Sequence, residues 1–149
     1  MAGEPRRLQE LSPRDSMKLL GSVPLGRIAF TVRALPAVHP ARHIVADEHV
    51  IVCADGGIAI TSAKPGSGTV VAYQADVIDP ADNLGWSVTV VGMAHRVADP
   101  AAADAFRQAL HHWADGTNGQ IISISPGVVT GFRLLGPNPA NSVSASRPG

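Results

Sequence analysis

Short runs of alternating apolar and polar residues, rich in Val and Ile, follow one another closely along most of this chain. The runs cover residues 26–32, 34–45, 49–53, 69–78, 86–97 and 120–125 with 128–135. Alternation with a period of two is typical of strands that bury one face. Strands this close in sequence pair antiparallel, because a parallel crossover needs a dozen or more residues. Six strands in one small sheet would expose two edges unless the sheet closes, so the pattern predicts a small antiparallel β-barrel.

Start and stop signals for helices occur at two places outside these runs. A Ser-Pro pair at residues 12–13 supplies a side-chain cap and a first helical residue, and Gly21 ends the segment. An Asp-Pro pair at residues 99–100 begins a longer segment, whose apolar residues recur at helical spacing up to about Trp113. The sequence therefore predicts a mainly β protein with two short helices.

One domain is the expectation for 149 residues, and we assign it to residues 12–135. Residues 1–11 are polar and predict a flexible N-terminus, while residues 136–149 are rich in Pro, Asn, Ser and Gly and predict a disordered tail. No apolar run follows Arg6 and Arg7, and no run in the chain reaches the roughly 18 residues of a membrane helix. We therefore expect a cytoplasmic protein without membrane contact.

Charge and cysteine content argue against several functions. Twelve Lys and Arg balance twelve Asp and Glu, so a nucleic-acid partner is not expected, because such binding needs an excess of positive charge. Cys53 is the only cysteine, which excludes a disulfide within the chain and a cysteine-based zinc site. His39 and His43 lie four residues apart on an extended segment, too far apart to share one ion at about 3.3 Å per residue. The sequence therefore predicts no metal site.

Sequence motifs for nucleophilic, phosphate-binding and metal-dependent catalysis are absent. The chain has no G-x-S-x-G, no G-x-x-x-x-G-K, no G-x-G-x-x-G after a strand and no H-E-x-x-H. Residues 64–69 (KPGSGT) have the composition of a phosphate loop, but no helix is expected after them. An ordinary hairpin loop is the favoured interpretation of this segment.

Two further features are compatible with a planar ligand. Pro36 and Pro40 remove backbone donors from the second run but leave its carbonyls and remaining amides available. Such a backbone suits either the rim of a flat heterocycle or an edge strand that is protected from aggregation. Trp86 opens the longest run, a position that suits a flat ligand, a subunit interface or the core. The residues alone leave these alternatives open.

Several local motifs occur together in an order and spacing that resembles one known family. They are VPLGRIAFTV, ALPAVHPARHIV, VVAYQADVID, GWSVTVVGMAHRVADP and ISPGVVTGFRL, within a region from about Ser12 to Leu135. This arrangement resembles the pyridoxamine 5′-phosphate oxidase-like, flavin-binding split β-barrel family, and most of all its small actinobacterial-type members. The resemblance implies a six-stranded antiparallel split β-barrel and a homodimer with flavin sites between its subunits. It also implies hydride or electron transfer to a small-molecule substrate.

The resemblance implies a cofactor as well, which is FMN or, in related branches, the deazaflavin coenzyme F-420. The cofactor supplies the chemistry in such a site, so no protein acid or base is obligatory and no catalytic residue is assigned. Carried onto this sequence, the cofactor-binding residues are His39, Pro40, Ala41, Arg42, Cys53, Ala54, Gly57, Ile58, Thr61, Ser62, Trp86, Ser87 and Arg133. Of these, residues 39–42 would flank the isoalloxazine ring, and those between 53 and 62 would meet the ribityl phosphate.

This chain departs from the family pattern where the phosphate would be held. Members often have a Thr or Arg and then a Lys after the third strand, whereas residues 54–58 here contain no cation, and Phe132 replaces a basic residue of the final motif. A hydrogen bond to a charged group contributes about 1.5–3 kcal/mol, so FMN binding is weakened unless Arg27, Arg42 or Lys64 compensates. Three functions remain: an FMN-dependent oxidoreductase, an F-420-dependent reductase, and a split barrel that binds a ligand without redox chemistry.

Overall fold

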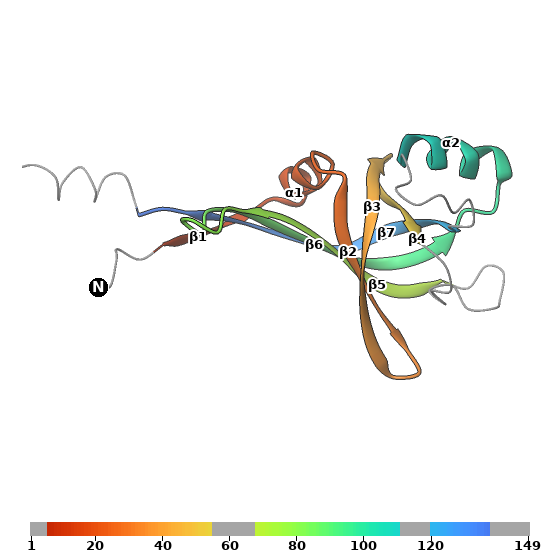
Figure 1. The fold of residues 1–149 in the computed structure, drawn as a ribbon, viewed down its shortest axis with the longest axis horizontal. Helices are drawn as coiled ribbons and strands as arrows, with labels where there is room; N and C mark the ends of the chain where they lie inside the picture. The colour runs from red at the N-terminus through yellow and green to blue at the C-terminus, as the bar shows by residue number, and fades with distance from the viewer. Residues whose placement is uncertain (1–5, 55–67, 111–119, 138–149) are drawn as a thin grey trace, which may run out of the picture.

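A computed structural model describes residues 6–54, 68–110 and 120–137 of the chain (Figure 1). Within these residues the elements follow one another as β1 (Arg7–Leu11), α1 (Pro13–Leu20), β2 (Leu25–Val32), β3 (Leu35–Ala46), β4 (His49–Ala54), β5 (Thr69–Ile78), β6 (Gly85–Arg96), α2 (Pro100–Leu110) and β7 (Gln120–Leu135). The strands expected from alternation match these bounds to within one residue at each end. The alternation therefore located the strands of the barrel.

The strands form one antiparallel sheet that closes on itself. Their order is β1-β7-β4-β3-β2-β5-β6, and a further pairing of β6 with β7 completes a ring of six strands. Closure gives the backbone groups of β6 and β7 partners at what would otherwise be open edges of the sheet. The predicted antiparallel split-barrel fold with two helices is confirmed.

Strand β1 is a seventh strand, attached to the ring through β7. It pairs antiparallel with the last residues of β7, with Leu8 opposite Leu134. The prediction of a flexible N-terminus over residues 1–11 is therefore wrong for residues 7–11, whereas residues 1–5 lie outside the described part. Four of the five side chains of β1 are exposed, so backbone hydrogen bonds to β7 order this segment rather than burial of an apolar face.

Strand β7 runs without interruption through Pro126. The register between β6 and β7 shifts next to Gly92, and Gly127 faces no residue of β6 at that point, which is a β-bulge. A Cβ on residue 92 would lie only 1.9 Å from the carbonyl oxygen of Ser125, so the two strands approach closely because residue 92 is glycine. The apolar phase of residues 86–97 also changes around Gly92, so the sequence itself indicates a bulge at this position.

The two helices cover different parts of the barrel. Helix α1 packs against β6 and β7, and its last residue, Leu20, belongs to the main core inside the ring. Helix α2 packs against β3, β4 and β7 over a second cluster formed by Ile51, Cys53, Ala103, Leu110 and Ile121. Neither of these helices, the only two among the described residues, is long and apolar enough to span a membrane.

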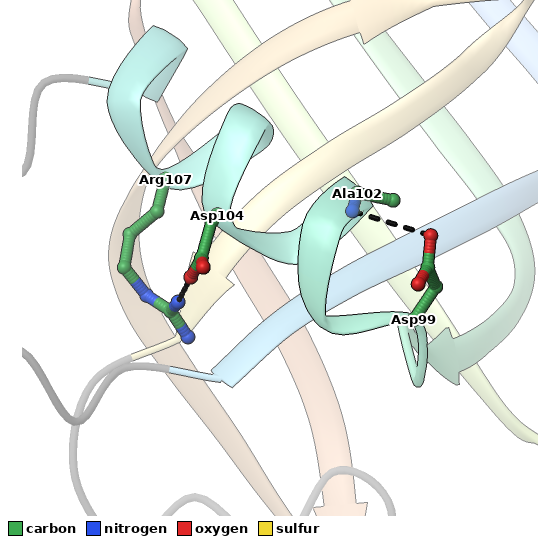
Figure 2. A network of polar contacts seen from close by, with 4 residues as sticks. All are labelled: Asp99, Ala102, Asp104 and Arg107. Atoms are coloured by element: carbon green, nitrogen blue, oxygen red, sulfur yellow. Dashed lines mark hydrogen bonds and ion pairs between the residues drawn. The ribbon is translucent and has the colours of Figure 1, made fainter.

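Both helices begin at the expected caps. The Ser12 hydroxyl accepts a hydrogen bond from the Asp15 amide at 3.1 Å at the start of α1. Figure 2 shows the corresponding bond in α2, where the Asp99 carboxylate accepts from the Ala102 amide at 3.3 Å. One turn further on, Asp104 and Arg107 form an ion pair at 2.9 Å. The end expected for this helix, Trp113, lies outside the described residues.

The hairpin of β2 and β3 projects away from both helices (Figure 1). Its two turn residues, Arg33 and Ala34, have φ values of +52° and +65°, which is the left-handed region that a two-residue hairpin turn requires. Strand β4 pairs with β3 only over residues 42–46. Residues 35–41 therefore have β2 as their one ladder partner in the described part of the chain.

Candidate functional site

The segment that the resemblance assigns to the flavin ring lies on an edge of β3 that has no strand partner within residues 6–54, 68–110 and 120–137. Pro36 and Pro40 both fall within the stretch that has only β2 as a partner. Proline is tolerated there because its missing N–H would have no strand to bond. The edge-strand interpretation of these prolines is confirmed for the described residues, in which β2 is the one strand that pairs with residues 35–41.

Side chains in this segment differ in exposure. His39 and Pro40 are exposed, while Ala41 is buried in the main core. The His39 ring stacks on the Phe30 ring of β2, with 5.4 Å between the ring centroids and 21° between their planes. This contact holds His39 on the hairpin, where its polar ring edge is accessible.

Arg42 connects the same strand to helix α2. Its Nε donates a hydrogen bond of 2.8 Å to the carbonyl oxygen of Leu110, the last described residue of the helix. This bond ties β3 to α2. One of its five N–H donors is used in this bond, which leaves others for an anion beside the strand. Arg42 therefore has a structural role in addition to the binding role that the sequence suggested.

Cys53 lies directly opposite Arg42 in the ladder between β3 and β4. Its side chain is 5% exposed and packs in the second cluster, under helix α2. Ala54 is the last residue of β4. The next four residues of the prediction, Gly57, Ile58, Thr61 and Ser62, and with them Lys64, lie outside the described residues.

The other three predicted residues, Trp86, Ser87 and Arg133, lie on β6 and β7. Trp86 is 8% exposed and packs in the main core. Arg133 lies opposite Trp86 in the ladder of β6 and β7 but is exposed. It lines a groove of about 430 Å³ together with Gln9, Glu10, Leu11, Ser12, Asp15, Lys18 and Leu19. Arg133 therefore lies in a groove that none of the other described cofactor residues lines.

A small pocket on the outer surface of the barrel adjoins Pro40. It has a volume of about 270 Å³ and is lined by Leu25, Gly26, Arg27, Pro40 and Asp76. The Gln74 amide nitrogen donates to Asp76 Oδ2 at 2.7 Å and to Ser87 Oγ at 3.2 Å. Gln74 thus connects Ser87, which is half-buried, to the rim of this pocket. No sequence motif distinguishes Gln74 or Asp76 from other polar residues on the exposed side of a strand.

A buried polar pair, His43 and Tyr73, lies behind this pocket. The Tyr73 hydroxyl lies 2.6 Å from His43 Nδ1 and donates to the Ala41 carbonyl at 3.0 Å. His43 Nε2 lies 2.7 Å from the carbonyl oxygen of Leu20. Sequence reasoning missed this pair, although both residues fall on the apolar phase of their strands, where a polar side chain needs a buried partner.

Burial sets the protonation of this pair. It lowers the pKa of His43, an effect partly opposed by the hydrogen bond to Leu20. Burial also raises the pKa of Tyr73. Both side chains are therefore neutral at pH 7. Since the Leu20 carbonyl can only accept, Nε2 carries the imidazole proton, and the single proton of the Tyr73 hydroxyl is shared between His43 Nδ1 and the Ala41 carbonyl.

Among the described residues, no three His, Cys, Asp or Glu side chains lie close enough together to hold a metal ion. The donors near the predicted cofactor residues are instead cationic. Arg27 lies opposite Pro40 in the ladder of β2 and β3, and Arg42 follows two residues later. This donor set suits an anionic group beside β3.

Comparison with known proteins identifies the family. The model of the pyridoxamine 5′-phosphate oxidase family matches residues 12–132. The uncharacterized protein Rv0080 from Mycobacterium tuberculosis is 40% identical over 134 residues, which cover 87% of this chain and 88% of that protein. The chain belongs to the pyridoxamine 5′-phosphate oxidase family, so the resemblance of its motifs is confirmed.

Solved structures agree with this assignment. The FAD binding protein from Mycobacterium smegmatis has a TM-score of 0.62 and 31% identity, over 84% of this chain and 98% of that one. A FAD-binding protein from Mesorhizobium loti has a TM-score of 0.73 over 89% of this chain and 100% of that one. Its identity is 21%, so this second similarity is one of fold.

Proposed function

We propose that this protein is a flavin-dependent oxidoreductase that acts on a small molecule. The observation that carries the proposal is the unpaired edge of β3 at Pro40, in a chain of this family that is 31% identical to a FAD binding protein. An edge with available amides and carbonyls can hydrogen-bond the polar rim of a flat heterocycle. Arg27 and Arg42 lie beside that edge and suit the phosphate of the same ligand.

The chemistry that a bound flavin supplies is hydride or electron transfer, while the protein contributes binding and orientation. His39, Pro40 and Ala41 would lie along the ring, with Ala41 turned towards the core. Arg42 would hold the phosphate while its Nε remains bonded to Leu110. We assign no acid or base to a protein side chain.

Three cofactors fit this proposal: FMN, the deazaflavin coenzyme F-420, and FAD, which the names of the similar proteins add. The test is a visible spectrum of the purified protein, followed by separate titrations with the three compounds and mass spectrometry of any released chromophore. We expect one of the three to bind with a Kd in the micromolar range or below. Failure of all three to bind would refute the proposal.

The proposal includes a homodimer, because Arg133 lies in a groove that none of the other described cofactor residues lines. The outer surface of β5, β6 and β7 carries Val70, Val91, Met93 and Val128, each at least 37% exposed. Val70 lies opposite Met93 and Val91 opposite Val128, so the four side chains form one patch. Contiguous apolar surface of this kind favours a protein interface. Light scattering should give twice the mass of 15.4 kDa, and a monomer at micromolar concentration would contradict this.

A second candidate function is ligand binding without redox chemistry. It is favoured by the sequence of β4, HVIVCA, which carries no Lys or Arg for a phosphate. In this case the protein would bind a flavin or deazaflavin but would not turn it over. Steady-state oxidation of the reduced cofactor by any added acceptor, faster than in free solution, would exclude this second function.

A further inference from the structure

The buried His43–Tyr73 pair forms one continuous polar connection across the barrel. It begins at the Leu20 carbonyl at the end of α1, passes through His43 of β3 and ends at the Tyr73 hydroxyl of β5. The same hydroxyl bonds the Ala41 carbonyl, so β3 is held at two successive inward-facing residues. The side chains of Tyr73 and His43 are 0% and 2% exposed. Water cannot replace these bonds without opening the core.

A glycine makes the connection possible. Tyr73 is on β5, and β2 separates β5 from β3 in the sheet. The phenol must therefore extend across β2, and it does so at Gly26, where a Cβ would lie 2.6 Å from the hydroxyl oxygen. Gly26 is also part of the wall of the pocket that contains Pro40 and Arg27. The polar connection thus lies directly behind the pocket.

The connection acts on the part of β3 that the sheet supports least. Among the described strands, only β2 pairs with residues 35–41, so the strand edge could bend or twist away from the barrel. Tyr73 bonds the last residue of that stretch, Ala41, and His43 lies just beyond it. Hydrogen bonds from the core side leave the opposite side of the strand open to a ligand.

We propose that Tyr73 and His43 are positioning residues for the flavin site, which hold the backbone of residues 39–42 in place for contact with the ring. This inference rests on the proposed function. Neither side chain touches the cofactor, because both are enclosed in the core. Their contribution is to reduce the motion of the strand edge before the ligand binds, which strengthens binding by preorganisation.

The test compares Tyr73→Phe with the control Val88→Ala in the full chain. Tyr73→Phe keeps the ring and removes only the hydroxyl. Val88→Ala shortens a fully buried side chain on β6, a strand whose partners are β5 and β7. FMN, FAD and coenzyme F-420 are titrated separately, with fluorescence of the cofactor as the signal, and thermal unfolding of each variant gives its loss of stability.

We expect Tyr73→Phe to raise the Kd for the bound flavin at least tenfold, and Val88→Ala to raise it less than threefold. Amide hydrogen exchange of residues 39–44 in the flavin-free protein should accelerate in Tyr73→Phe and stay unchanged in Val88→Ala. His43→Gln, which keeps a donor and an acceptor, should bind more tightly than His43→Leu.

The inference is overturned if Tyr73→Phe binds within threefold of the wild type, or if the control weakens binding equally. Unchanged hydrogen exchange in Tyr73→Phe would overturn it as well. Wild-type protein that binds none of FMN, FAD and coenzyme F-420 would refute the proposed function and this inference together. Wild-type binding with an unaltered Kd in Tyr73→Phe would refute the positioning role alone.

Discussion

Substitution of Gly26 by alanine tests the packing behind the candidate site most directly. The added Cβ would lie 2.6 Å from the Tyr73 hydroxyl oxygen and 2.7 Å from Tyr73 Cε1 and from the carbonyl oxygen of Gln74. Ordinary carbon contacts are about 3.5–4.0 Å, so the phenol must withdraw by about 1 Å. A displacement of that size breaks the hydrogen bonds to Ala41 and His43, which are 3.0 and 2.6 Å long.

The magnitude follows from the groups left without partners. Each buried hydrogen bond contributes about 0.5–1.5 kcal/mol, and a buried acceptor without a donor costs about 1–3 kcal/mol. We therefore expect Gly26→Ala to lower the free energy of unfolding by about 2–4 kcal/mol. For a domain of this size that corresponds to a fall in Tm of about 10 °C.

The control is Gly21→Ala at the end of α1. A Cβ there would meet its nearest atoms at 3.5 Å, and the φ of −70° suits any residue, so little change is expected. A double-mutant cycle with Tyr73→Phe then isolates the hydroxyl. Gly26→Ala should cost about 1–2 kcal/mol less in the Tyr73→Phe background, because the hydrogen bonds are already absent. Urea unfolding gives the free energy of unfolding of the wild type, the two single variants and the double variant. If the losses of the two single variants add to that of the double variant within about 0.5 kcal/mol, the reasoning is refuted.

Three further predictions concern affinity, pH and helix capping. Arg42→Ala should raise the Kd for the bound flavin more than tenfold, or about 1.4 kcal/mol, in a fluorescence titration, whereas an unchanged Kd would exclude a phosphate-binding role. The pKa of His43 is lowered by burial from its ordinary 6.5, so the unfolded chain takes up the proton first as the pH falls. The contribution of neutral His43 to the free energy of unfolding is therefore complete above pH 6.5 and declines below it. His43→Gln should flatten that decline when urea unfolding is measured as a function of pH. Asp99→Ala should lower the free energy of unfolding by about 0.5–2 kcal/mol through loss of the α2 cap, measured as Tm, while Asp104→Ala should change it by less than about 1 kcal/mol.

Local patterns in the sequence were sufficient for the strands and for the helix starts. Alternation of apolar residues depends only on the pleat of a strand, and the caps at Ser12 and Asp99 depend on residues three positions away. The bulge at Gly92 and the edge character of Pro36 and Pro40 followed from the same local rules. The family motifs are also local, and they identified the family and the fold.

Tertiary structure decided what depends on register between distant segments. Strand β1 is ordered because it pairs with an edge of β7. The sequence of residues 7–11 carries no signal that predicts this pairing. The sequence was compatible with Trp86 at a flat ligand, at a subunit interface or in the core. In the structure Trp86 packs in the core.

The polar partners were equally invisible in the sequence. Tyr73 and His43 are thirty residues apart and meet only because Gly26 lets a side chain cross β2. Arg42 meets the Leu110 carbonyl only because α2 packs beside β3. A sequence determines which side of its strand a residue faces, but the closure of the barrel determines which residue it meets there.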